Sequence, residues 1–327
     1  PPAFRRRLRE GIRRAAALKR KSKDRFFKVL EKELTRRHAQ AVAACLKANR
    51  IRRDEVALIG FHGQTVFHDP KHRQTWQLGD GKLLARLTGI DVAADFRAND
   101  MRFGGEGAPL APLYHRALFA NYARRTPLAV LNLGGVANVT WLCRDKILAF
   151  DCGPGNALLD DWVLARAGKP FDRNGRLAAA GRADRAVVKK WLGGAYFKKP
   201  PPKSLDRNAF STKEIEKLKI ADGAATLAAF TVEAIAKARA HFPKTPRTWM
   251  VTGGGRRNRF LMKALRKRLK AGVRPLEAFG FNGDALEAEA FAFLAVRALR
   301  KLPLSLPETT GVDKPVSGGK FFRVRSR

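Results

Sequence analysis

Residues 24–49 have the spacing of an amphipathic helix, because apolar side chains recur there at steps of three and four. The residues of this apolar stripe are Phe27, Leu30, Leu34, Val42 and Leu46. Short apolar runs at 56–60 and 91–96 predict two strands, and the polar stretch 62–70 predicts a loop after the first of them. A second helix is predicted over 82–88, and it ends at the glycine that follows.

The middle of the chain predicts several strands in quick succession. Apolar runs at 128–133, 136–142 and 147–150 are joined by short turns, which is typical of a meandering sheet. Asp151 is expected at the end of the third strand, and the next helix is expected to begin near Ala157. That helix should end at Gly168.

The later part of the chain is predicted to be mainly helical, with one strand at 248–252 that ends in three glycines. The predicted helices span 174–193, 212–241, 256–271 and 284–301. This mixture of strands and helices predicts an α/β fold, and 327 residues are enough for two domains. We place the domain boundary near Arg125, which gives domains of 1–125 and 126–327.

Composition narrows the setting in which the protein works. No run approaches 18 consecutive apolar residues, so we expect no transmembrane helix, and the N-terminal residues lack the apolar stretch of a signal peptide. The cysteines are Cys45, Cys143 and Cys152. They are few and far apart, without metal-ligand spacing, so we expect no metal site built from them and a reducing, cytoplasmic location.

The charge of the chain is unusual. Its formal net charge is +37, with 66 Lys and Arg against 29 Asp and Glu. A basic surface gains affinity for phosphates through counterion release, which raises the possibility of a nucleic-acid-binding protein. The basic residues are, however, spread along the whole chain between apolar helix positions, and no zinc-finger spacing or RNA-binding aromatic signature accompanies them. We therefore expect nonspecific binding of polyanions and no specific nucleic-acid partner.

The segment from Asp151 to Asn156 (DCGPGN) is the strongest candidate for chemistry. A carboxylate at a strand end can act as a general base toward water or a sugar hydroxyl. The amides of Gly153 and Gly155, together with the start of the next helix, can stabilise charge on a transferring phosphoryl group. The structural alternative is that Asp151 simply caps a turn.

Two further glycine clusters follow predicted strands, and each lets the backbone approach a phosphate closely. They are Gly134–Gly135 and Gly253–Gly255. Neither matches a Walker loop or a Rossmann fingerprint, so a tight turn is the alternative for each.

Polar side chains also follow the two earlier strands, where α/β folds place ligands. Asp95, Arg97 and Asp100 are suited to gripping sugar hydroxyls or a carboxylate. His62 belongs to the same set, although a hydrogen bond within its own loop is the alternative. Glu287, on a predicted helix, either reaches a ligand or is exposed to solvent.

In chain order, these and other segments resemble one family, anhydro-N-acetylmuramic acid kinase, over about residues 50 to 320. The matching segments are HGQTVFH (62–68), QLGD (77–80), DFR (95–97), GGEGAP (104–109), NLGGVANVT (132–140), DCGPGN (151–156), Asp160 with Trp162, PPKSLD (201–206), 253–258, 284–291, 309–311 and 317–319.

The resemblance implies a two-domain fold of the actin/hexokinase class that closes over its ligands, and a homodimer. It also implies the use of ATP with Mg²⁺ to open the anhydro bridge of 1,6-anhydro-N-acetylmuramic acid with water and to phosphorylate O6, a step in the recycling of peptidoglycan sugars. In this resemblance, Asp151 matches the aspartate that acts as general base toward water. The sugar-side segments contain His62, Asp95, Arg97, Gly105, Glu106, Gly107 and Glu287. The nucleotide-side segments contain Gly134, Gly135, Asn138, Gly153, Gly155, Asn156, Gly253, Gly254 and Gly255.

The chain departs from the family pattern in two respects. The first is the absence of an initial Ser-Gly-Thr-Ser-x-Asp-Gly-x-Asp phosphate loop, which predicts a truncated N-terminal domain. The second is the charge of +37. Two alternatives stay open at this point. One is a kinase for another sugar. The other is an inactive kinase-derived fragment or engineered cationic variant that binds polyanions nonspecifically.

Overall fold

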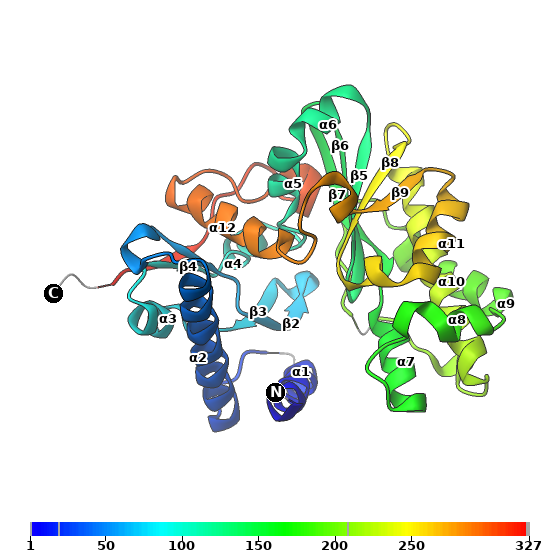
Figure 1. The fold of residues 1–327 in the computed structure, drawn as a ribbon, viewed down its shortest axis with the longest axis horizontal. Helices are drawn as coiled ribbons and strands as arrows, with labels where there is room; N and C mark the ends of the chain where they lie inside the picture. The colour runs from blue at the N-terminus through cyan, green and yellow to red at the C-terminus, as the bar shows by residue number, and fades with distance from the viewer. Residues whose placement is uncertain (1, 19, 208, 325–327) are drawn as a thin grey trace. The chain divides into compact units, whose positions relative to one another are not determined.

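The computed structural model describes residues 2–18, 20–207 and 209–324, which form two compact units (Figure 1). Unit 1 comprises Pro1–Ala111, Glu287–Pro307 and Gly311–Arg327, and unit 2 comprises Pro112–Leu286 and Glu308–Thr310. This division differs from the boundary expected near Arg125. Helix α12 (Leu286–Leu299) explains why the chain returns to unit 1, because its apolar face packs in the same core as β4 (Val92–Ala94).

Unit 1 is built around a small mixed sheet. Strand β4 is at its centre, with β1 (Ile59–Phe61) parallel on one side and β10 (Lys320–Phe322) antiparallel on the other. A separate hairpin is formed by β2 (Gln64–Asp69) and β3 (Gln74–Leu78). The remaining helices of this unit are α1 (Pro2–Leu18), α2 (Arg25–Ala48), α3 (Gly81–Thr88) and α4 (Ala98–Arg102).

Helices α2 and α3 begin and end where local chemistry favours it. The Asp24 carboxylate accepts a hydrogen bond from the N–H of Phe27 at 3.0 Å and so caps α2. Helix α3 ends at Gly89, whose φ of 67° suits a glycine cap. The apolar stripe predicted for α2 is confirmed at its N-terminal end, where Phe27 packs on Trp76 of β3 with 4.4 Å between ring centroids.

Unit 2 contains a five-stranded sheet of order β7-β6-β5-β8-β9. Its strands are β5 (Leu128–Leu133), β6 (Val136–Cys143), β7 (Lys146–Pro154), β8 (Thr248–Thr252) and β9 (Gly272–Pro275). The first three form the predicted antiparallel meander, while β8 and β9 lie parallel to β5. The predicted positions of β5 and β8 are confirmed to the residue.

Helices cover the sheet of unit 2, and Figure 1 shows α10 and α11 beside it. The helices are α5 (Pro112–Leu118), α6 (Ala120–Arg125), α7 (Ala157–Ala167), α8 (Arg176–Ala180), α9 (Arg185–Leu192), α10 (Ile220–Ala238) and α11 (Arg259–Leu269), with short α13 (Pro307–Thr310). One core contains side chains of α7, α8, α10 and α11 together with Ala129, Leu131 and Leu133 of β5. Because the alternating residues Leu128 and Val130 are buried too, both faces of β5 are covered, as its continuous apolar run predicts.

Four local predictions were wrong. The helix predicted over 212–241 begins only at Ile220, after a separate short 3-10 helix at Lys213–Ile215. The stretch 62–70 is largely strand β2, because Val66 is buried against the partner hairpin strand and the helices. The third meander strand does not stop at residue 150, since β7 continues to Pro154 and places Asp151 within the strand. The predicted helix 174–193 is broken into α8 and α9 at Gly181, where a Cβ would lie 2.0 Å from the carbonyl oxygen of Ala221.

Of the helices that the structure describes, none is both long and apolar enough to cross a membrane.

Candidate active site

Asp151 is buried within β7 and pairs with Asn138 of β6 across a register irregularity. Its carboxylate Oδ2 accepts a hydrogen bond from the N–H of Leu205 at 2.8 Å. Its backbone N–H donates to the carbonyl oxygen of Lys203 at 3.0 Å, and its own carbonyl oxygen accepts from the Tyr196 hydroxyl at 2.6 Å. A carboxylate held in this way has a fixed orientation, which a general base requires.

The segment 196–205 is therefore part of the site. The sequence identified residues 201–206 as a family motif but assigned them no role. Tyr196 carried no sequence signal, because its contribution is a single hydroxyl brought 45 residues back along the chain to Asp151. The hydrogen bonds from Tyr196 and Leu205 mean that Asp151 does more than cap a turn of its own loop.

The glycine clusters predicted from the sequence meet at the ends of β5, β7 and β8. The N–H of Gly155 donates to the carbonyl oxygen of Gly135 at 3.0 Å, and that of Asn156 donates to Gly134 at 2.7 Å. A Cβ on Gly155 would lie 2.1 Å from the carbonyl oxygen of Gly134, so only glycine allows this approach.

The third glycine cluster, Gly253–Gly255, lies against the same turns. A Cβ on Gly253 would lie 2.5 Å from Asn132 Oδ1, and one on Gly255 would lie 2.7 Å from Asn156 Nδ2. Gly254, by contrast, faces open space. Helix α7 starts directly after Asn156, so its partly positive N-terminus lies beside these turns. In this arrangement, backbone amides of the turns and the N-terminal end of α7 can bind phosphate oxygens.

Arg256 belongs to the matching segment 253–258, and the sequence analysis assigned it no role of its own. It is 7% exposed, and its guanidinium donates to the carbonyl oxygen of Gly253 at 3.0 Å. It also pairs with Glu277 at 2.7 Å and with Asp284 at 2.8 Å. The arginine thereby fixes the Gly253–Gly255 turn. Its position directly after three glycines was the one signal available.

In unit 1, His62 and Arg97 form a half-buried pair. The Nε–H of Arg97 donates to His62 Nε2 at 2.8 Å, and its Nη1–H donates to the carbonyl oxygen of Gly107 at 2.5 Å. Since Nε2 accepts, the ring proton is on Nδ1, which lies 2.8 Å from the carbonyl oxygen of Gly63. Burial, reinforced by the Arg97 charge, lowers the pKa of His62 to about 3, so the ring is neutral at physiological pH.

The loop 104–109 is held from within unit 1. Asp100, only 2% exposed, accepts a hydrogen bond from the N–H of Gly107 at 2.6 Å. Its carbonyl oxygen accepts from the N–H of Gly105 at 2.9 Å. Asp100 is thus a buried support of the loop that carries Gly105, Glu106 and Gly107, and the expectation that it grips the sugar directly is not supported.

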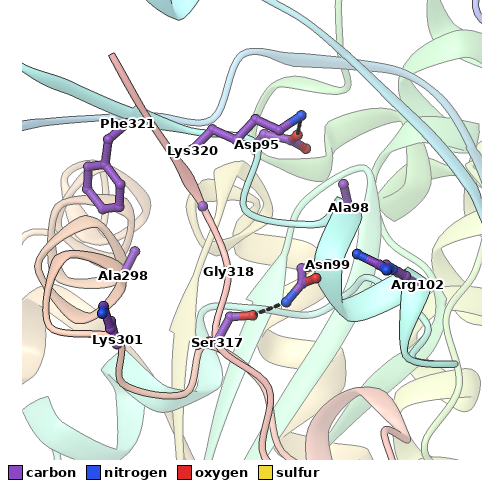
Figure 2. A pocket seen from close by; sticks show the side chains of 11 residues that line it. Asp95, Ala98, Asn99, Arg102, Ala298, Lys301, Ser317, Gly318, Lys320 and Phe321 are labelled. Atoms are coloured by element: carbon purple, nitrogen blue, oxygen red, sulfur yellow. Dashed lines mark hydrogen bonds and ion pairs between the residues drawn. The ribbon is translucent and has the colours of Figure 1, made fainter. Parts of the chain in front are cut away.

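Asp95 follows β4 in a left-handed conformation, with φ of 57°. Its carboxylate pairs with Lys320 of β10 at 2.8 Å. This pair lines a pocket of about 520 Å³, together with Asn99, Arg102 and other residues of unit 1. Figure 2 shows the side chains that line it. The structure brings His62, Arg97 and Gly107 together, and it gives Asp95 a partner outside that set.

Glu287 lies in the first turn of α12 and is exposed, as is Glu289. One helical turn further along, the Phe291 ring lies 4.5 Å from the His62 ring. Residues four apart share a helix face, so Glu287 lies on the side of α12 that faces His62.

The described residues contain no group of three or more His, Cys, Asp or Glu side chains that could hold a metal ion. Mg²⁺ is commonly bound through substrate phosphates with one or two protein ligands and does not require such a group.

Comparison with known proteins agrees with these local observations. The sequence model of the family described as anhydro-N-acetylmuramic acid kinase matches residues 3–323. The anhydro-N-acetylmuramic acid kinase of Paramagnetospirillum magneticum is 54% identical over 295 residues, which cover 89% of this chain and 82% of the relative. That of Zymomonas mobilis is 46% identical over 322 residues, which cover 97% of this chain and 88% of the relative.

The matches extend across both units and include every segment on which the resemblance was based. The expected α/β fold class is confirmed by the structure, and the expected kinase activity is confirmed at the level of the family. The chain belongs to the anhydro-N-acetylmuramic acid kinase family.

Proposed function

We propose that the protein uses ATP and water to convert 1,6-anhydro-N-acetylmuramic acid into N-acetylmuramic acid 6-phosphate. The observation that carries this proposal is the fixed, buried carboxylate of Asp151 beside the glycine turns of unit 2. Family membership supplies the identity of the substrate. This reaction recovers a cell-wall sugar. We propose that the enzyme is cytoplasmic and that it is a homodimer.

The chemical step requires a base toward water. Asp151 takes one proton from a water molecule as the water oxygen forms a bond to C1 of the sugar. The C1–O6 bond breaks, and its electron pair stays on O6. The freed O6 attacks the γ-phosphorus of ATP and ADP leaves, so the products are the 6-phosphate and ADP, with the proton released from Asp151 to solvent. The hydrogen bond from Leu205 to Oδ2 keeps the carboxylate oriented throughout.

The nucleotide is assigned to the glycine turns. Their backbone amides, together with the N-terminal end of α7, favour negative charge on the phosphates. We place Gly134, Gly135, Gly153, Gly155 and Gly253–Gly255 around the phosphates, with Asn138 and Asn156 at their edge. We propose that Mg²⁺ enters with ATP, bound to its phosphates.

The sugar is assigned to the residues of unit 1. Arg97 is permanently charged and anchors the Gly107 carbonyl, so it presents a fixed cation to a carboxylate or hydroxyl. Neutral His62 accepts a hydrogen bond from Arg97 and donates one to the Gly63 carbonyl oxygen, so we assign it the role of orienting Arg97 toward the sugar. Gly105, Glu106 and Gly107 then form the adjacent loop, and Glu287 and Asp95 complete the proposed set.

Turnover in ¹⁸O-water tests the whole proposal. The purified protein is incubated with ATP, Mg²⁺ and the anhydro sugar, and the product is weighed by mass spectrometry. We expect the 6-phosphate to carry one ¹⁸O, at C1, because the bridge is opened by water. Glucose under the same conditions serves as the control for a kinase of another sugar. No product from folded protein at high concentration contradicts the proposed activity, and a product without ¹⁸O contradicts the hydrolytic step.

A further inference from the structure

Lys203 is a buried cation to which the proposed reaction assigns no role. It is 3% exposed. Its ammonium donates to the carbonyl oxygens of Lys199 at 2.8 Å and Tyr196 at 3.3 Å. It also lies over the rings of Tyr196 and Phe150, at 4.8 and 5.8 Å from their centroids. Burying a charge is costly unless such contacts compensate, so the ammonium must stabilise a particular local structure.

That structure is the segment 196–205, and its two ends both hold Asp151. At one end, the Tyr196 hydroxyl donates to the Asp151 carbonyl oxygen at 2.6 Å. At the other end, the Leu205 N–H donates to Asp151 Oδ2 at 2.8 Å. The Lys203 carbonyl oxygen accepts from the Asp151 N–H at 3.0 Å.

The ammonium links these two ends. It connects the part of the segment near Tyr196 and Lys199 to the part near Leu205, so that the segment is closed over β7. Without this connection, the Leu205 N–H would depend on the loop backbone alone for its aim at the carboxylate. The ammonium of Lys203 thus closes the segment, and the hydrogen bonds of Tyr196 and Leu205 hold the closed segment on Asp151.

The electrostatic surroundings agree with this geometry. Burial, and next the Asp151 charge, raise the pKa of the Cys152 thiol, whereas the Lys203 charge lowers that pKa. The carboxylate and the ammonium therefore act on the same thiol with opposite signs. Burial lowers the pKa of Lys203, and the nearby Lys199 and Lys237 add to this shift. His241, whose pKa is also lowered by burial and by Lys203 and Lys237, faces the same region.

We propose that Lys203 is a positioning residue for the reaction, because its ammonium closes the segment 196–205 that orients the Asp151 carboxylate. This inference rests on the proposed function, in which Asp151 is the general base. Lys203 itself touches no reacting atom.

The central test is Lys203→Met, compared with Lys198→Met. Lys198 is exposed and lies within the same segment, at the end of the 3-10 helix Ala195–Lys198. Its replacement by methionine also removes one positive charge but leaves the Lys203 hydrogen bonds that close the segment in place. We expect kcat of Lys203→Met to fall about 100-fold, because an error of about 1 Å in aiming a catalytic group has that effect. KM for the sugar and for ATP should stay within about 3-fold, since no substrate contact is removed.

The split between kcat and KM separates positioning from general damage. Equal losses of kcat in both variants would overturn the proposal. So would a loss of kcat in Lys203→Met that is matched by a rise in both KM values.

Two further measurements cover a variant that fails to fold and an inactive wild type. Tyr196→Phe removes the hydroxyl that donates to the Asp151 carbonyl oxygen, and we expect kcat to fall about 10-fold at unchanged KM. Amide hydrogen exchange reports the closure without any turnover: the N–H groups of Asp151 and Leu205 should lose protection in Lys203→Met and keep it in Lys198→Met. If the wild type shows no turnover, the proposed function fails, whereas the exchange result still decides whether Lys203 closes the segment. Unchanged exchange at both amides would overturn that closure.

Discussion

Replacing Gly155 by alanine tests the meeting of the glycine turns most directly. The added Cβ would lie 2.1 Å from the Gly134 carbonyl oxygen and 3.1 Å from the Ala137 nitrogen. Both are backbone atoms of the opposite turn, so no flexible side chain can move aside. Real Cβ atoms are essentially never closer than 3.0 Å to such an atom, so the two turns must separate by about 0.9 Å.

The expected loss follows from this separation. It strains the hydrogen bonds from Gly155 to Gly135 and from Asn156 to Gly134, which are 3.0 and 2.7 Å long. Overpacking of this kind costs about 1–3 kcal/mol, and each strained hydrogen bond adds up to about 1 kcal/mol. We expect Gly155→Ala to lower the free energy of unfolding of unit 2 by about 3 kcal/mol. Displaced amides should also reduce kcat by about 100-fold.

Gly254→Ala is the matched control for stability, because a Cβ there meets open space. Urea denaturation followed by the tryptophans of unit 2 gives the unfolding free energies, and calorimetry gives the affinity for ADP. Gly254→Ala should unfold like the wild type, and any loss of ADP affinity in it would mark the open space as the path of the nucleotide. A Gly155→Ala variant as stable as the wild type would refute the observed approach of the two turns. Normal stability together with lost ADP binding would refute the link between packing and nucleotide contact.

Three other predictions concern separate features. Asp151→Asn should lower kcat by at least about 100-fold and keep ADP affinity, and undiminished turnover would remove Asp151 from the mechanism. His62, with its pKa lowered to about 3, takes up a proton near pH 6.5 only when unfolded, so unit 1 should lose stability as the pH falls from about 6.5 toward 3. His62→Gln should flatten that slope when urea midpoints are compared across pH, and an unchanged slope would assign it to other groups. Arg256→Met should lower the stability of unit 2 by about 2 kcal/mol. This loss is smaller than that of a fully buried ion pair because the partners Glu277 and Asp284 reach solvent. The same variant should bind ADP more weakly. Calorimetry with unchanged ADP affinity would show that the Gly253 turn does not need this arginine.

The strands and helices with strong local signals were predictable from the sequence. Strand β5 has a continuous apolar run between turns, and its position was predicted to the residue. Helix α7 lies between the predicted start near Ala157 and the glycine stop at Gly168. The prediction failed where packing between segments far apart in the chain determines the position at which a helix ends. At Gly181, where the predicted helix is broken, the backbone packs against the Ala221 carbonyl, which lies 40 residues away along the chain.

The candidate site was predictable to a similar extent. The glycines and Asp151 belong to short motifs, so the sequence identified them one by one. Tyr196 and Arg256 were assigned no role, because a hydroxyl or guanidinium that acts through a backbone carbonyl leaves no local pattern. Asp100 was given the wrong role for the same reason: its burial and its bond to the Gly107 N–H are set by the fold of the loop.

The sequence by itself determined the family, the α/β class and the residue types able to hold phosphate, because these depend on the order of short motifs along the chain. The tertiary structure alone decided which glycines meet, which way the Asp151 carboxylate is held and which tautomer His62 adopts. Each of these depends on atoms from segments far apart in the chain, at distances that only packing fixes. The clearest case is Gly155, which the sequence presents as one glycine among 28 and the fold presses against Gly134.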